Sequence, residues 1–87
     1  PAGKKDTKAK QNIVISIDKN QKLFLGQKQI DINLIDTILR AEVLRQRAFI
    51  DTPSVVVNAD TSAYYGEVFK VMQSAKRAGA KVVAIVK

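Results

Sequence analysis

The chain has 87 residues, no cysteine, no histidine and a formal net charge of +7. The length indicates one small domain, the lack of cysteine excludes disulfides and thiol chemistry, and the lack of histidine removes the commonest general base and metal ligand. The charge favours acidic partners such as nucleic acid, anionic lipid headgroups or an anionic wall polymer, although lysines that only solvate the surface are a commoner reason for such a balance.

The first eleven residues, Pro1–Gln11, contain no large apolar side chain and predict a flexible linker. Their net charge is +3, because Asp6 is outnumbered by four lysines: Lys4, Lys5, Lys8 and Lys10. The chain starts with proline rather than methionine, as expected of a fragment or a processed product. No stretch approaches the roughly 20 apolar residues of a membrane helix, so any targeting or anchoring segment is expected upstream.

The domain is expected to begin at Asn12 with a β-hairpin. Apolar residues alternate with other residues over Ile13–Ile17, which predicts a strand with one buried face. Asp18–Gln21 has turn composition, with Asn20 suited to a left-handed conformation. The apolar pattern resumes at Leu23–Leu25 and ends at Gly26, which completes the predicted hairpin.

A first helix is predicted from Leu34 to about Ala48, with Asp31 as a plausible N-cap. Asp36 and Arg40 are four residues apart on its polar side and are expected to pair weakly. Pro53 bars helix through Thr52 and places a loop before the next element. The expected apolar stripe consists of Leu34, Ile38, Ala41 and Ala48, widened by Ile35, Leu39, Val43 and Leu44.

The remainder predicts a β-α-β unit. Val55–Val57 is a short apolar run typical of a strand buried on both faces, and Val82–Val86 is expected to be the last strand. Between them a helix is expected from about Ala63 to Ala78. Ser62 or Asp60 can cap the start of this helix. Its expected core face consists of Tyr65, Val68, Phe69, Val71, Met72, Ala75 and Ala78.

The predicted order is therefore ββαβαβ, an α+β two-layer sandwich in which both helices lie on one face of a mixed sheet. The two strands joined by the second helix should be parallel, with a right-handed crossover. A sheet covered on one side leaves an open face or open edges, and open edges invite another strand. This is the first indication of a binding role.

The segment from Val55 to Val86 resembles the periplasmic domain of the ExbD/TolR family. The resemblance rests on four dipeptides between two apolar strands: Ala59-Asp60, Tyr65-Gly66, Val71-Met72 and Ala78-Gly79. Asp60 can bond to amides at the helix start, Tyr65 offers an apolar ring with a polar tip, and Gly79 can adopt the left-handed conformation that ends a helix. These three roles are structural.

The resemblance implies a single-pass inner-membrane protein with a short cytoplasmic tail, one membrane helix and this domain, residues 12–87, in the periplasm. Residues 1–11 would then be the tether beside the membrane. The proton-carrying aspartate of the family lies in the membrane helix, outside this chain. The implied partners are a second copy, a pentameric ExbB/TolQ-type channel, and either a TonB/TolA-type transducer or peptidoglycan.

No residue pattern indicates an enzyme, a cofactor or a metal site. The serines have no histidine to activate them and no Gly-x-Ser-x-Gly elbow. No Walker loop or dinucleotide glycine motif is present, and the aspartates lack the spacing of a metal-binding loop.

Two functional hypotheses remain. The first is an interaction domain that couples proton flow to a transducer or to peptidoglycan, and the alternative is a small basic α+β domain that binds nucleic acid. RNA-binding sheets display exposed stacking aromatics, whereas Tyr65 and Phe69 are expected on a core face, which weakens the alternative.

In the first hypothesis, proton flow shifts the membrane helices and the domain alternately captures and releases a partner segment by strand addition. A homodimer is expected through the same kind of edge pairing. The residues expected at this dimer or partner edge are Lys8, Lys10, Asn12, Val14, Val83 and Ile85.

Overall fold

The computed structural model describes residues 12–86. Its elements along the chain are β1 (Ile13–Ile17), β2 (Leu23–Leu25), β3 (Lys28–Ile30), η1 (Ile32–Leu34), α2 (Ile35–Gln46), β4 (Ser54–Ala59), α3 (Tyr65–Arg77) and β5 (Lys81–Val86). The predictions for Pro1–Gln11 lie outside the described residues.

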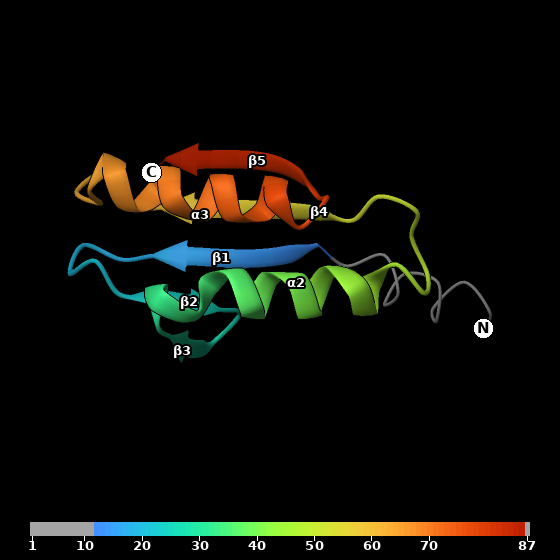
Figure 1. Cartoon of the computed structure of the whole chain (residues 1–87). Coiled ribbons are helices and arrows are strands. Elements are labelled where there is room, and N and C mark those ends of the chain that lie inside the picture. Colours follow the sequence, from blue (N-terminus) through green and yellow to red (C-terminus); the bar gives the residue numbers. More distant parts are fainter. Residues whose placement is uncertain (1–11, 87) are drawn as a thin grey trace, which may run out of the picture.

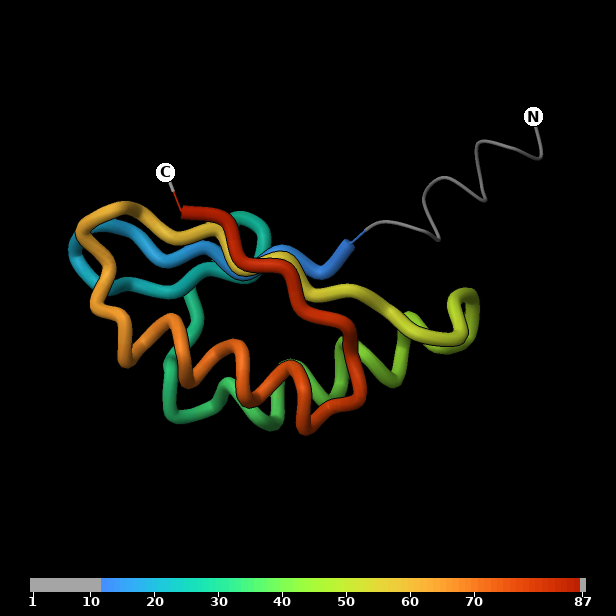
Figure 2. Tube along the Cα trace, turned by 90° about the horizontal axis from the view of Figure 1, so that it is seen from above, coloured from blue at the N-terminus to red at the C-terminus, as the bar shows by residue number. Residues whose placement is uncertain are grey.

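The strands form one mixed sheet in the order β3-β2-β1-β4-β5 (Figure 1). β1 pairs in parallel with β4, and β4 pairs in parallel with β5, whereas β1–β2 and β2–β3 are antiparallel. Both helices cover the same face of this sheet, so the molecule has two layers (Figure 2). The predicted fold class and the parallel strands of the β-α-β unit are confirmed.

One strand, β3, was not predicted. It has only three residues, of which Lys28 and Gln29 are polar and exposed. So short a segment carries no alternation from which a strand could be recognised. It pairs with β2 across a tight turn at Gly26, whose φ is 62°.

The core lies between the sheet and the two helices. Alternate residues of β1 and β4 supply the sheet side, and each strand shows a strict buried and half-buried alternation. The buried apolar residues are Ile13, Ile15, Ile17, Leu23, Ile35, Leu39, Val43, Val55, Val57, Ala59, Val68, Val71 and Ala75.

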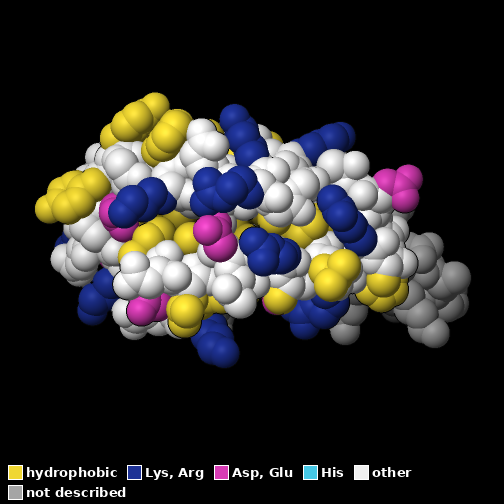
Figure 3. All heavy atoms as spheres, in the orientation of Figure 1, with side chains coloured by type: hydrophobic (Ala, Val, Ile, Leu, Met, Phe, Trp, Pro, Cys, Tyr) yellow, Lys and Arg dark blue, Asp and Glu magenta, His cyan; other side chains and the backbone are white. Residues whose placement is uncertain are grey.

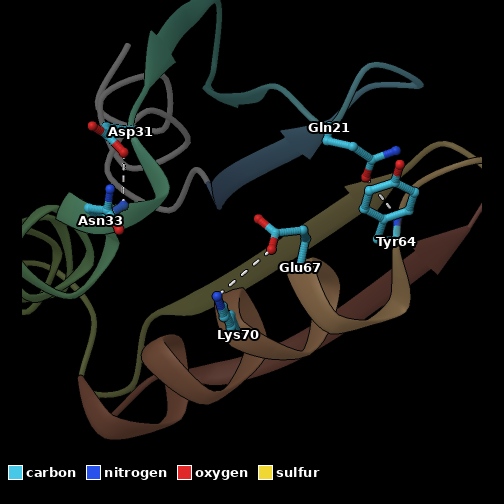
Figure 4. A network of polar contacts seen from close by, with 6 residues as sticks. All are labelled: Gln21, Asp31, Asn33, Tyr64, Glu67 and Lys70. Atoms are coloured by element: carbon cyan, nitrogen blue, oxygen red, sulfur yellow. Dashed lines mark hydrogen bonds and ion pairs between the residues drawn. The ribbon is translucent and has the colours of Figure 1, made fainter.

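Helix α2 buries only part of the predicted stripe. Its buried residues are Ile35, Leu39 and Val43, at four-residue intervals, whereas Leu34 and Leu44 are 54% and 71% exposed. Asp31 does cap this region as expected, but it accepts from the amide of Asn33 and so caps the short turn η1 (Figure 4). Because the apolar residues surround much of the helix, the sequence alone could not decide which of them meet the sheet.

The two helices are joined by Asp36. Its carboxylate accepts hydrogen bonds from the hydroxyl of Ser74, which is buried, and from Nη2 of Arg77 at 2.8 Å. The predicted partner was Arg40, one turn along α2, and the observed partners lie on α3. The Ser74 hydroxyl and then the Arg77 guanidinium stabilise the ionised form and lower the pKa of Asp36.

Asp36→Asn should therefore lower the melting temperature at pH 7, where the wild-type carboxylate is ionised. A lowered pKa means that this stabilisation is present above the ordinary aspartate value of about 3.9 and is lost as the pH falls through the lower native value. The gap between variant and wild type should consequently shrink in acid. Thermal melts followed by circular dichroism between neutral pH and strong acid measure it.

Asp51→Asn is the matched control, since Asp51 is an exposed carboxylate in the loop before β4. Its melting temperature should track that of the wild type at every pH. An Asp36→Asn deficit that persists unchanged in acid would contradict the role of the charge.

Candidate interaction site

Strand β5 is the long edge of the sheet. It has six residues and, among residues 12–86, pairs only with β4, and Val83, Ile85 and Val86 are 49%, 43% and 63% exposed. The opposite edge, β3, is protected by being short and polar. A long apolar edge is a template for another strand, so β5 is the edge most suited to pairing.

The outward backbone groups of β5 belong to its even-numbered residues. The amide of Lys81 donates to the carbonyl oxygen of Pro53 at 2.9 Å, so residue 81 faces the β4 side. Backbone groups alternate in direction along a strand, so Val83 and Ile85 also face β4. Val82, Ala84 and Val86 therefore direct their amides and carbonyls away from the sheet.

A shallow apolar hollow lies beside these outward groups. Val82, Ala84 and Val86 are in register with Val55, Val57 and Ala59, so their side chains lie on the helix side of the sheet. Between β5 and α3 the hollow has a volume of about 390 Å³. It is lined by Ala59, Asp60, Thr61, Ala63, Tyr65, Val68, Met72, Ala84 and Val86.

Two exposed aromatic side chains lie at the start of α3. Tyr65 is 80% exposed and Phe69 is 47% exposed, and their rings stack with centroids 6.3 Å apart. Figure 3 shows hydrophobic side chains gathered where α3 begins and β5 ends. The expectation that both rings face the core is wrong, because the sheet covers only the arc of Val68, Val71 and Ala75.

The face of the sheet opposite the helices carries the other side chains. Val14, Val56 and Val83 are in register across β1, β4 and β5, and Asn58 is in register with Ile85. Val83 and Ile85 therefore have apolar side chains on this face, and their backbone groups bond to β4.

The remaining predicted edge residues are placed differently. Val14 is not at an edge, because β1 is the middle strand and the Val14 carbonyl accepts from the amide of Gly26 at 3.1 Å. Asn12 is exposed just before β1. Lys8 and Lys10 lie outside the described residues.

The start of α3 is held by Gln21, a residue that the sequence did not single out. Its Oε1 accepts from the amide of Tyr64 at 2.7 Å (Figure 4), and its Nε2 donates to the carbonyl of Ser62 at 3.0 Å. Gln21 also has the left-handed backbone, at φ 66°, that was expected of Asn20. Asp60 accepts from the Ser62 amide in the turn before the helix, so neither Asp60 nor Ser62 caps the first turn of α3.

Gly79 ends α3 as predicted. Its φ is 90°, its amide donates to Lys76 at 2.9 Å, and the amide of Ala80 donates to Ala75 at 3.1 Å. These two bonds form a Schellman motif. A Cβ at this position would also overlap the guanidinium of Arg47.

Residues 12–86 hold no group of three or more side chains that could bind a metal ion. None of the helices in this part of the chain is long and apolar enough to cross a membrane. The site just described is thus a surface of backbone groups, apolar side chains and aromatic rings.

Comparison with known proteins identifies the family. The family described as "Biopolymer transport protein ExbD/TolR" matches residues 1–87. The chain belongs to the ExbD/TolR family. This family is associated with transport rather than with enzymatic catalysis, and the resemblance inferred from the β-α-β segment is confirmed.

A curated relative is similar over most of the chain. "Biopolymer transport protein exbD2" of Vibrio cholerae serotype O1 is 31% identical over 75 residues, which cover 84% of this chain and 52% of the relative. The ExbD/TolR chain described here thus spans about half the length of that protein.

Gly79→Ala should lower the free energy of unfolding by about 1 kcal/mol or more, because a side chain is strained at positive φ and must displace Arg47. Gly66→Ala is the matched control, since Gly66 lies within α3 and a Cβ there meets nothing within 4 Å. It should leave stability unchanged or raise it. Urea unfolding of both variants tests this, and equal stabilities would show that Gly79 is not a strained helix end.

Proposed function

We propose that residues 12–87 are the periplasmic interaction domain of a proton-motive-force-driven complex of the ExbB-ExbD-TonB or TolQ-TolR-TolA type. Membership of the ExbD/TolR family over the whole chain supports this role. The observation that carries it is the apolar edge of β5, which no other described strand covers.

The partner segment is captured by strand addition at β5. The outward backbone groups of Val82, Ala84 and Val86 supply hydrogen bonds that any extended segment can satisfy. Every second side chain of the added strand points to the helix side, where the hollow beside Ala84 and Met72 accepts an apolar group. Backbone pairing thus gives affinity and the hollow gives selectivity.

The same edge supports a homodimer. Two copies can pair their β5 strands, and Val83 and Ile85 then extend the apolar open face across both sheets. Because the second copy and the partner segment use the same backbone groups, dimer arrangement and partner capture are linked. Motion of the membrane subunits can then be converted into capture and release.

The Lys-rich segment Pro1–Gln11 serves as the tether in this proposal. It joins the domain to a membrane helix, outside this chain, that carries the proton-carrying aspartate and lies in an ExbB/TolQ-type channel. Peptidoglycan is the alternative periplasmic ligand to the TonB/TolA-type transducer.

Nucleic-acid binding remains the second candidate. Tyr65 and Phe69 do not face the core but are exposed and stacked, so they are available to stack on bases. Stacked aromatics and positive charge suit single-stranded RNA. Sedimentation with RNA and with purified peptidoglycan at low and high salt separates the two candidates. Tight, salt-sensitive RNA binding without retention by any envelope component would refute the transducer assignment.

Ala84→Pro should weaken both dimerisation and peptide capture while leaving the fold intact. Proline removes the Ala84 amide, which points outward, and proline is tolerated in edge strands whose amide faces solvent. Sedimentation velocity measures association, and circular dichroism measures folding.

Val83→Pro is the matched control, because the Val83 amide faces β4 and its loss breaks an internal ladder. This variant should lose thermal stability, as should Val14→Pro in the middle strand. A folded Ala84→Pro domain that associates like the wild type would exclude the β5 edge.

A further inference from the structure

The two ends of the molecule differ in chemistry. Strands β1, β4 and β5 are parallel, and both helices run back against them, so α2 and α3 end where the strands begin (Figure 1). The loops that contain Gln21 and Tyr64 lie at the other end. Asn12, the first described residue, precedes β1 and therefore lies at the end where α2 finishes.

Large apolar side chains are exposed at this end. Leu44 is 71% exposed and Phe49 is 67% exposed. The turn that carries Phe49 is hydrogen bonded, since the amides of Phe49 and Ile50 both donate to the carbonyl of Gln46 at 2.9 Å. This turn projects beyond the helices and the sheet (Figure 2), and neither Leu44 nor Phe49 lines the hollow beside β5.

Three basic residues lie at the same end of the molecule, as does the exposed carboxylate of Asp51. Arg45 is 69% exposed and forms an ion pair with Glu42, and the exposed Arg47 guanidinium lies beside Gly79. Lys76 in the last turn of α3 adds a further exposed cation. Figure 3 shows basic and hydrophobic side chains interleaved over the end of α2.

The sequence that leads into this end is also basic. Residues 1–11 carry four lysines against Asp6, and they join the domain at Asn12.

We propose that this end, the α2-end surface defined by Leu44, Arg45, Arg47 and Phe49, docks on an anionic lipid bilayer. Apolar side chains that project beside guanidinium groups match the interface of such a bilayer, where rings and aliphatic groups enter the headgroup layer and cations meet lipid phosphates. A soluble polyanion would use the charges and leave Leu44 and Phe49 in water. The inference uses no property of β5 and stands independently of the proposed function.

Lipid docking would hold the domain with its strands pointing away from the bilayer. The Gln21 and Tyr64 loops and the aromatic pair would then face outward. The β5 edge would remain open, because it runs along the side of the molecule.

A single tryptophan tests the proposal directly, since the natural chain has none. Phe49→Trp in the 87-residue chain should show a blue-shifted emission with vesicles of phosphatidylcholine and phosphatidylglycerol, and no shift with phosphatidylcholine alone. The shift should diminish at high salt because salt screens the attraction. Tyr65→Trp, at the opposite end, should show no shift with either vesicle.

Charge variants form the second arm. Arg45→Gln with Arg47→Gln should weaken binding to the anionic vesicles by about 25-fold, because each basic side chain near an anionic surface contributes about fivefold. Lys19→Gln with Lys22→Gln removes the same charge from the opposite end and should leave binding close to that of the unmodified chain. Vesicle co-sedimentation measures both, with circular dichroism as the folding control.

Three results would each overturn the proposal. The first is an unchanged Phe49→Trp emission with anionic vesicles, repeated with Leu44→Trp if Phe49→Trp does not fold. The second is an equal blue shift with soluble polyglutamate, which would show anion binding without a bilayer. The third is a shift that depends on protein concentration without vesicles, which would make this surface a contact between copies of the chain.

Discussion

The pairing of β1 with both β2 and β4 is the constraint on which the rest of the structure depends. It places Ile13, Ile15 and Ile17 in the core. The backbone groups of β1 are hydrogen bonded to neighbouring strands on both sides. With β1 in the middle, the last strand must add at the outside. Two helices on one face can bury that face, but they cannot cover the edge that results.

The properties of β5 follow from this arrangement. Its odd-numbered residues complete the ladder with β4, and its even-numbered residues have outward backbone groups and helix-side side chains. The Schellman motif at Gly79 sets where β5 starts. The hollow exists because small residues, Ala59, Ala63 and Ala84, line the space between this strand and α3. The residues of β5 that bond to β4 thus differ from those whose backbone groups face outward.

The α2-end surface and the β5 edge occupy different parts of the molecule. An interaction at one therefore leaves the other accessible. The bond network of Asp36 with Ser74 and Arg77 ties α2 to α3.

Much of this architecture was determined by the sequence itself. Alternation over Ile13–Ile17, the apolar runs near Val55 and Val82, and the Gly79 helix end are local signals, and each was read correctly because backbone geometry and burial act over a few residues. The family resemblance of the β-α-β segment rests on such local signals too.

Tertiary structure alone decided which of several apolar and polar groups meet. Tyr65, Phe69 and Leu44 are large side chains of the kind usually found in a core, yet all three are exposed. Asp36 lies near Arg40 in sequence but bonds residues on α3, and Gln21 holds a loop 43 residues away. Val14 has the pattern of any strand residue, and only the strand order places it in the middle of the sheet. These outcomes depend on which elements become neighbours, and that is settled by the packing of the whole chain.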